Sequence, residues 1–188
     1  MDSIFGLIFF IFLLPMLIAV AVLIRLDSKG PVVFRQRRTG FEGAEIHVLK
    51  FRTMRVVEDG DRVSQATRAD GRVTRLGSFL RRTSIDELPQ LINVIKGEMS
   101  LVGPRPHALL HDRMFADLVP NYANRFRARP GMTGLAQVSG LRGEVRCQND
   151  IVERVRLDNE YIDRWSLMLD IKILVATMFV APFQRNAY

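Results

Sequence analysis

The sequence of 188 residues contains little cysteine and little lysine. Cys147 is the only cysteine, so no disulfide can form within the chain and nothing indicates an oxidising compartment. Lysine supplies only 4 of the 27 basic residues, and arginine supplies the other 23. Because a guanidinium group binds phosphate oxygens in pairs, this excess suits a protein that handles phosphate. A genome rich in arginine codons would give the same excess. The positions of the arginines, not their number, must therefore show whether they bind phosphate.

The familiar nucleotide-binding and hydrolytic motifs are also missing. The chain has no Walker loop, no GxGxxG, no paired cysteines and no defensible Ser-His-Asp pattern. The net charge of +7 nevertheless points towards phosphate-bearing partners, namely anionic lipid, nucleic acid or nucleotide. The basic residues are dispersed among 20 acidic ones, with no Lys/Arg-rich run and no aromatic stacking motif, which disfavours nucleic acid. A nucleotide would therefore need an uncommon kind of binding site.

An uncharged apolar run covers Ile4–Ile24. About 20 such residues suffice for a helix to cross the hydrocarbon core of a bilayer. A cleaved signal peptide would need a basic start, whereas this chain begins Met1-Asp2-Ser3. We therefore predict a membrane anchor at residues 1–25 and a cytoplasmic, membrane-associated domain at residues 26–188. The cytoplasmic side is indicated by the basic residues that follow the apolar run, namely Arg25, Lys29, Arg35, Arg37 and Arg38.

Two features of the apolar segments leave alternatives open. Pro15 lies near the middle of the first run, where it removes a backbone donor and predicts a kink in the helix. A kinked helix can span the bilayer, or it can enter and return to the same face. Ile171–Phe183 is apolar but only about 13 residues long, too short to span. It is predicted either as a core helix or as a helix in the membrane interface.

The polar middle of the chain mixes strand and helix patterns. Val32–Arg38 and Ile46–Thr53 are predicted as two strands joined by a glycine-containing turn. Leu76–Arg82 is predicted as a short helical turn, Asp150–Trp165 as a helix, and the polar segment Arg55–Arg75 as a long loop. The predicted fold class is α+β: mostly helical with a small β-hairpin or sheet, an N-terminal membrane-embedded, proline-kinked helix and interfacial helices.

A further helix is predicted to begin at Asp86. In a helix beginning at Ser84, Pro89 would clash with an earlier carbonyl, but at the third position of a helix beginning at Asp86 its missing N–H costs nothing. Free N–H groups and the helix dipole near Asp86 would favour phosphate and keep a carboxylate ionised. An ionised carboxylate can attack phosphorus, and Glu87 could hold a divalent cation. An ordinary N-cap would explain Asp86 equally well. The apolar face and the stop of this helix are formed by Leu88, Leu91, Ile92, Ile95 and Gly97.

Two proline-containing loops each present an arginine. Gly103-Pro104-Arg105-Pro106 follows the apolar strand Met99–Val102, and Arg129-Pro130-Gly131-Met132-Thr133-Gly134 lies further along the chain. Proline restricts the backbone on both sides of Arg105, which reduces the entropy lost when the side chain binds an anion. Arg-Pro pairs are also ordinary turn material, but two such rigid loops exceed what a random surface needs.

Five motifs follow one another along the chain: Leu26-Asp27-Ser28-Lys29-Gly30-Pro31, Lys50-Phe51-Arg52-Thr53-Met54, Thr83-Ser84-Ile85-Asp86-Glu87-Leu88-Pro89-Gln90, Gly103-Pro104-Arg105-Pro106 and Arg129-Pro130-Gly131-Met132-Thr133-Gly134. Each motif alone is weak, whereas all five in this order are very specific. With them the sequence resembles the bacterial sugar transferase family, the monotopic phosphoglycosyl transferases. The resemblance extends over nearly the whole chain.

This resemblance implies a transfer in two steps. Asp86 attacks the β-phosphate of a UDP-sugar and expels UMP, and polyprenyl phosphate then attacks the phosphosugar-aspartate. Members of the family place the N-terminal helix as a re-entrant hairpin with both ends in the cytoplasm. One departure is Leu14, which precedes Pro15 where relatives usually carry serine. The predicted site comprises the catalytic pair Asp86 and Glu87, with Glu87 as a ligand of Mg²⁺, and the phosphate-binding residues Arg81, Arg105, Arg52 and Arg129.

Motifs near the C-terminus resemble the branch that primes exopolysaccharide synthesis with glucose-1-phosphate, with galactose-1-phosphate as the close alternative. They are Leu141-Arg142-Gly143-Glu144, Tyr161-Ile162-Asp163-Arg164-Trp165-Ser166-Leu167 and Asn186-Ala187-Tyr188. The predicted partners are a UDP-sugar, undecaprenyl phosphate and membrane lipid, not nucleic acid, and a homo-oligomer is left open. The predicted location is the cytoplasmic face of the bacterial inner membrane. The alternative from another class is a non-enzymatic, membrane-tethered anion-binding or scaffold protein.

Overall fold

The computed structural model describes residues 1–55, 70–143, 145 and 147–180. Most of the loop predicted at Arg55–Arg75 and the end of the segment predicted at Ile171–Phe183 therefore lie outside the described residues. The elements are α1 (Asp2–Asp27), β1 (Val33–Thr39), η1 (Phe41–Gly43), β2 (Glu45–Phe51), α2 (Arg75–Thr83), η2 (Ile85–Gln90), α3 (Leu91–Ile95), β3 (Ser100–Val102), α4 (Leu109–Leu118), η3 (Tyr122–Arg127), β4 (Gly131–Thr133), α5 (Leu135–Val138), α6 (Gln148–Asp163) and α7 (Leu167–Val180). The described part is mostly helical with a small hairpin, as the sequence predicts, and it has a second small sheet that the sequence does not predict.

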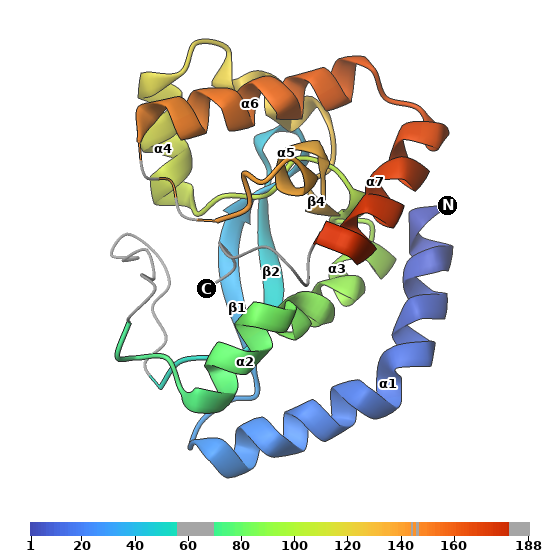
Figure 1. Cartoon of the computed structure of the whole chain (residues 1–188), viewed down its shortest axis with the longest axis vertical. Coiled ribbons are helices and arrows are strands. Elements are labelled where there is room, and N and C mark those ends of the chain that lie inside the picture. Colours follow the sequence, from blue (N-terminus) through green and yellow to red (C-terminus); the bar gives the residue numbers. More distant parts are fainter. Residues whose placement is uncertain (56–69, 144, 146, 181–188) are drawn as a thin grey trace.

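The predicted hairpin is present at the centre of the molecule (Figure 1). Strands β1 and β2 pair antiparallel, with Val33 opposite Phe51 and Thr39 opposite Glu45. The turn between them passes through η1, where Gly43 has a φ of +80°, a conformation that glycine adopts without steric cost. The hairpin prediction is therefore confirmed, and it supplies the surface on which η2 rests.

A second, two-stranded sheet joins the two Arg-Pro loops. Strand β3 pairs parallel with β4, so that Ser100 lies beside Gly131 and Val102 beside Thr133. The sequence predicts only a loop for Arg129–Gly134, and this is wrong for its central residues, which form β4. The strands can pair because Gly103 and Gly131 have no side chains: a Cβ on Gly131 would lie 2.1 Å from the backbone nitrogen of Gly103.

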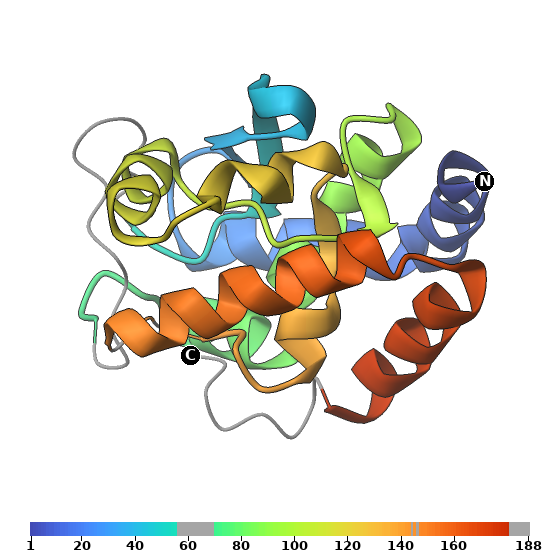
Figure 2. The same ribbon diagram turned by 90° about the horizontal axis from the view of Figure 1, so that it is seen from above.

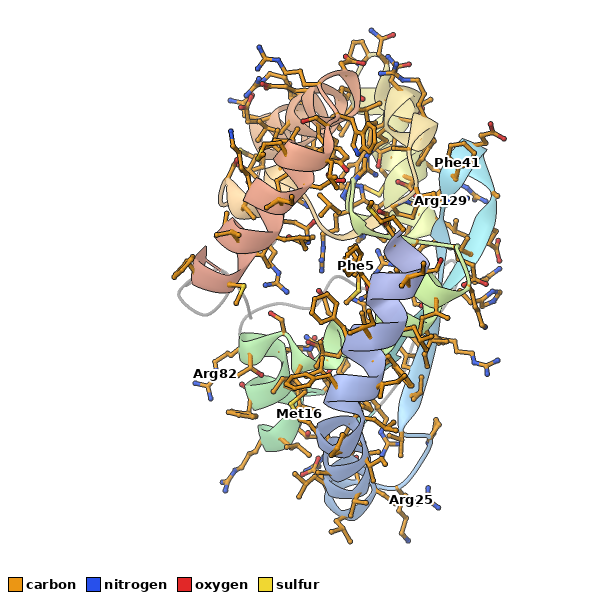
Figure 3. The ribbon with its side chains drawn as sticks, turned by 90° about the vertical axis from the view of Figure 1, so that its right-hand side faces the viewer. Phe5, Met16, Arg25, Phe41, Arg82 and Arg129 are labelled. Carbon is orange, nitrogen blue, oxygen red and sulfur yellow. The ribbon has the colours of Figure 1, made fainter. Side chains whose placement is uncertain are left out.

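Helix α1 follows the edge of the molecule and leaves most of its apolar side chains exposed. Among the described residues it is the one helix long and apolar enough to cross a membrane. In Figure 1 its first part runs beside α3, and its later part turns to run beneath α2. Phe5, Met16 and Arg25 mark its course in Figure 3. The predicted apolar helix is confirmed, and its re-entrant placement stays a prediction.

Three apolar clusters hold the elements together. One joins the hairpin, α3, β3, α6 and α7 around Val48, Val94 and Ile173, and residues from the first part of α1 pack against it. A second lies between the later part of α1, Phe51 and Leu80. A third lies between α4, η3 and α6. The helix predicted at Asp150–Trp165 is confirmed as α6, which crosses the molecule in Figure 2.

Helix α7 packs one side into the core, as a core helix would, and its placement in the membrane interface stays a prediction. Ile173 is buried in the first cluster, whereas Met178 is 75% exposed and Phe179 is 69% exposed. In Figures 1 and 2, α7 and the start of α1 lie at the same end of the molecule. The two most apolar helices thus share one end, and each keeps an outward apolar face.

Candidate active site

The acidic pair is carried by a short 3₁₀ helix. The sequence predicts an α-helix from Asp86 onwards, but 85–90 is the 3₁₀ helix η2, and the α-helix α3 begins only at Leu91. Ser84 precedes η2 in a left-handed conformation with a φ of +60°, and its side chain makes no capping hydrogen bond. The predicted N-cap position for Asp86 is therefore wrong. Pro89 gives the reason: it lacks an N–H and would crowd the carbonyl of Ile85 in an α-helical turn, so the chain winds more tightly.

Apolar packing on one side holds η2 in place. Ile85 and Leu88 pack against the apolar cluster that contains Phe51 and Leu80. The side chains of the acidic pair consequently face the interior, and Asp86 and Glu87 are each only 8% exposed. The surroundings of the pair are nevertheless charged. Four basic side chains lie close enough to change the pKa values of the two carboxylates, namely Lys50, Arg81, Arg105 and Arg142.

Glu87 is surrounded by positive charge. Lys50 Nζ lies 2.9 Å from its Oε1, and Arg105 Nη2 lies 2.6 Å from the same oxygen. Arg142 Nη2 lies 3.2 Å from Oε2. Burial alone would raise the pKa of Glu87, but Arg105, Lys50 and Arg142 outweigh it and hold that pKa well below its ordinary value. Glu87 is therefore ionised and tightly held.

Asp86 has the opposite surroundings. No side chain or backbone group of the described residues donates a hydrogen bond to it, because the neighbouring cations bind Glu87 instead. Burial, and next the negative charge of Glu87, raise the pKa of Asp86 to about 6. The sequence-based expectation that a helix N-terminus would favour the charged form is thus wrong in direction. At neutral pH the carboxylate is still mostly ionised, and its oxygens are not held by donors of the described residues.

The predicted phosphate-binding arginines separate into two groups. Arg105 contacts Glu87 directly, and Arg81 lies close enough to influence the pKa of Asp86 while its Nε donates to Thr53 Oγ1 at 2.8 Å. Arg52 instead points towards the end of α1, where its Nη2 donates to the Ser28 carbonyl at 2.6 Å. Arg129 is exposed and does not contact the pair. Only Arg81 and Arg105 are brought to the acidic pair.

Two basic residues of this site were not predicted as members. Lys50 reaches Glu87 from β2, and Arg142 reaches it from the segment after α5. Both lie within motifs that the sequence displays, Lys50-Phe51-Arg52 and Leu141-Arg142-Gly143, but position in a motif does not say which side chain turns inward. Arg82, which follows Arg81 in the sequence, is exposed and extends away from α1 in Figure 3.

The acidic pair fits a magnesium ion that binds together with phosphate. The described residues contain no cluster of three or more acidic, histidine or cysteine side chains, so in that part of the chain no all-protein metal cage exists. Mg²⁺ commonly takes only one or two carboxylates and completes its coordination with substrate phosphates and water. Asp86 and Glu87 supply that number of carboxylates, and the surrounding cations suit a diphosphate.

A buried carboxylate pair ringed by lysine and arginine is typical of sites that transfer phosphate groups. Comparison with known proteins agrees with this class. The bacterial sugar transferase family matches residues 1–184. The chain belongs to the bacterial sugar transferase family.

Individual relatives give the same picture. A UDP-glucose:undecaprenyl-phosphate glucose-1-phosphate transferase of Caulobacter vibrioides is 52% identical over 174 residues, which are 93% of this chain and 65% of that protein. A protein of the same name from Xanthomonas campestris pv. campestris is 48% identical over 188 residues, 100% of this chain and 39% of that protein. The exopolysaccharide production protein PSS of Rhizobium leguminosarum bv. phaseoli is 46% identical over 170 residues, 88% of this chain and 85% of that protein. The chain thus spans less than two thirds of the first two relatives.

Proposed function

We propose that this protein transfers glucose-1-phosphate from UDP-glucose to undecaprenyl phosphate and releases UMP, as the first membrane step of exopolysaccharide synthesis. The names of the first two relatives support the donor and the acceptor, and the name of the third supports the process. The observation that carries the proposal is the contrast within the acidic pair: Glu87 holds three cations, while Asp86 is a buried carboxylate to which no described residue donates a hydrogen bond.

The proposed reaction follows from that contrast. A carboxylate oxygen of Asp86 forms a bond to the β-phosphorus of the UDP-sugar, and the bond from that phosphorus to the bridging oxygen breaks, which releases UMP. An oxygen of undecaprenyl phosphate then attacks the same phosphorus and displaces Asp86. Because the Asp86 oxygens are not held by donors of the described residues, little has to be broken before they attack.

The cations around Glu87 would stabilise the charge of the diphosphate. Lys50, Arg105 and Arg142 converge on one carboxylate, so a substrate that brings further negative charge would bind where these groups already lie. Magnesium, when bound, would supply additional positive charge to the phosphate oxygens, and Glu87 would hold it. Arg81, which lies near Asp86, would bind the phosphate that Asp86 attacks.

We also propose that α1 is re-entrant and that the site faces the cytoplasm at the inner membrane. Both ends of α1 are tied to the same domain: Ser100 donates to the Asp2 carboxylate, Ser3 Oγ donates to the Val94 carbonyl at 3.2 Å, and Arg52 binds Ser28. A spanning helix must place its ends on opposite sides of a hydrocarbon core about 30 Å thick. Ends that both bind one domain are consistent with entry and return at a single face.

The direct test of the proposed function is UMP release by the purified protein in lipid nanodiscs with UDP-glucose, undecaprenyl phosphate and Mg²⁺. Asp86→Asn should reduce UMP release to background, because a neutral amide is a very poor nucleophile. Asp117→Asn, at an exposed position on α4, is the matched control and should keep full activity. Without acceptor, mass spectrometry should find a phosphosugar on Asp86. Full turnover by Asp86→Asn would refute its role.

A screen of several UDP-sugars in the same assay identifies the donor. UDP-galactose is the close alternative, since the C-terminal motifs resemble relatives that transfer either glucose-1-phosphate or galactose-1-phosphate. We expect UDP-glucose to give the highest rate of UMP release. A higher rate with UDP-galactose would leave the reaction class intact and change the sugar.

A further inference from the structure

The loop that carries Arg105 is fixed at three successive carbonyl groups. Pro104 and Pro106 have no N–H, so the backbone of these two residues can form hydrogen bonds only through its carbonyl groups. The Pro104 carbonyl accepts from the N–H of Gly131 at 2.9 Å. The Arg105 carbonyl accepts from Nη2 of Arg125, and the Pro106 carbonyl accepts from Nη1 of Arg38 at 3.2 Å. Arg125 is thus the group that holds the backbone of Arg105 itself.

Arg125 lies almost completely inside the protein, with a side chain that is 2% exposed. A buried guanidinium is costly unless its donors are paired, and here each of its nitrogens has a partner. Nη2 and Nε donate to Oδ2 of Asp158 at 2.8 and 3.2 Å, and Nη1 donates to the hydroxyl of Tyr122 at 3.1 Å. Burial would lower the pKa of Arg125, but Asp158 and the other neighbours raise it above its ordinary value, so the group stays charged.

The partners of Arg125 come from separate parts of the fold. Asp158 lies on α6 and is 2% exposed, and Asp112 lies on α4 at 3.5 Å from Nη1 of Arg125. The Tyr122 hydroxyl donates to Asp112, and so does Thr39 at the end of β1, at 2.6 Å. One buried network therefore ties α4, α6, η3 and the hairpin to the backbone of Arg105.

We infer that Arg125 is a positioning residue of the proposed transferase: it acts through Arg105 and sets where that guanidinium lies beside Glu87. Among the described residues, Arg125 makes no hydrogen bond or ion pair with Asp86 or Glu87. It is linked to the pair through the Arg105 carbonyl, because the Arg105 side chain binds Glu87. The same guanidinium also binds Asp158 on α6. The position of Arg105 therefore depends on α6 as well as on its own loop. The expected effect on the rate of UMP release rests on the proposed function. The expected effect on the position of Arg105 does not.

The first test is a double-mutant cycle on UMP release. Arg125→Lys keeps a positive charge beside Asp158 but lacks the planar fork that also reaches the Arg105 carbonyl. We expect a fall in kcat of about tenfold or more for Arg125→Lys and for Arg105→Gln, with the melting temperature of Arg125→Lys near that of wild type. The double variant should be no slower than Arg105→Gln alone, because residues that act through one another are not additive. A double variant slowed by the product of the two single effects would overturn the inference.

The second test does not depend on activity. Phenylglyoxal modification followed by peptide mass spectrometry measures how accessible each arginine is. In Arg125→Lys we expect faster modification of Arg105, whereas Arg81 should react as in wild type. Arg127→Gln is the matched control on the same turn, since Arg127 is exposed and pairs with Asp163 at the surface. It should change neither the rate of UMP release nor the reactivity of Arg105.

The two tests separate the failures. If the wild-type protein releases no UMP with any donor, the proposed function fails, and the modification of Arg105 alone decides the inference. Unchanged Arg105 reactivity in Arg125→Lys would overturn the inference even in a fully active protein. If Arg125→Lys does not fold, the variant Arg125→Gln with Asp158→Asn removes both charges of the buried pair together, and the same two readouts apply.

Discussion

At the scale of single residues, two neighbouring carboxylates are given different properties by their surroundings. Glu87 is bound by three cations, which hold its pKa well below the ordinary value, while burial and Glu87 raise the pKa of Asp86 to about 6. Surroundings that make the pKa values of two acidic groups differ also give the two groups different chemical roles. In this site the more basic carboxylate is the proposed nucleophile, and the more acidic one organises positive charge.

Lys50 provides a test of that organisation. Lys50→Met removes one of the cations on Glu87 and leaves the volume of the side chain nearly unchanged. We expect kcat for UMP release to fall by about 10²-fold, the usual effect of removing one preorganised electrostatic group. Lys96→Met, at an exposed position just after α3, is the control and should keep the wild-type rate. A Lys50→Met variant with a kcat within a factor of two of wild type would exclude Lys50 from the site.

His107 predicts how stability depends on pH. Burial, and next Arg125, hold the pKa of His107 well below its ordinary value, so the folded protein keeps it neutral. The unfolded chain takes up a proton there below about pH 6.5, which favours unfolding by up to about 1.4 kcal/mol per pH unit. Stability is thus fully present above pH 6.5 and is lost as the pH falls. Thermal melts of His107→Gln between pH 7 and 5 should show a smaller loss than wild type.

His47→Gln is the control for that measurement, because His47 is exposed on β2. It should reproduce the wild-type change of melting temperature between pH 7 and 5. If His107→Gln and wild type lost stability in parallel over this range, His107 would not be the group that takes up the proton.

At the scale of elements, the parallel pair of β3 and β4 places the two Arg-Pro loops. The Ser100 N–H donates to the Pro130 carbonyl at 2.8 Å, and the Gly103 N–H donates to the Thr133 carbonyl at 2.8 Å. These bonds need the two backbones in close contact, which only glycine at positions 103 and 131 permits. The three-residue strand β3 therefore fixes the start of the loop that carries Arg105.

Gly131→Ala tests this close approach. A Cβ at Gly131 would lie 2.1 Å from the Gly103 nitrogen and 2.4 Å from the Thr133 oxygen, and backbone atoms cannot rotate away as a side chain can. We expect a loss of about 1–3 kcal/mol of stability, seen as a lower melting temperature, together with slower UMP release. Gly71→Ala is the control, since a Cβ there meets nothing within 4 Å. Equal melting temperatures for the two variants would contradict the assigned role of Gly131.

At the scale of the whole molecule, α1 follows one edge of the fold and α7 lies near its first part (Figure 1), and both helices expose apolar side chains, whereas Asp86 and Glu87 are buried. Pro15 lies within α1 without ending it, and the helix continues to Asp27. Because both ends of α1 bind the domain, the proposed membrane contact and the proposed site belong to one folded unit. A lipid-borne acceptor could then reach the site without leaving the membrane surface.

Cysteine labelling tests the re-entrant course. Cys147 is exposed, so it is first replaced by serine. Ser3→Cys and Asp27→Cys, each made in this background at an exposed position, mark the two ends of α1. In right-side-out vesicles we expect neither position to react with a membrane-impermeant maleimide, and in inverted vesicles we expect both to react. Reaction of one end in each vesicle type would establish a spanning helix and exclude the re-entrant one.

Much of the local structure follows directly from the sequence. The apolar run from Ile4 to Ile24, the two strands of the hairpin and the helix predicted at Asp150–Trp165 each correspond to an element of the fold. These predictions hold because each depends on neighbours in the chain. The start of the helix at Asp86 does not hold, because the prediction took Pro89 as compatible with an α-helix, and the chain adopts the tighter 3₁₀ turn instead.

The site depends on tertiary structure to a greater degree. Arg52 and Lys50 are two residues apart and belong to one motif, yet one binds Ser28 at the end of α1 and the other binds Glu87. Arg142 is 55 residues from Glu87 and meets it only in the folded chain. No spacing in the sequence predicts the link from Arg125 to the Arg105 carbonyl, because α4, α6 and η3 must first assemble around it.

By itself the sequence determined the apolar N-terminal helix, the hairpin, the acidic pair and the family to which the chain belongs, since composition and motif order are properties of the chain alone. Only the tertiary structure decided which arginines reach the pair and which carboxylate they bind. The physical reason is that a charge inside a protein is governed by burial and by neighbours within a few ångströms, and those neighbours are brought together by packing.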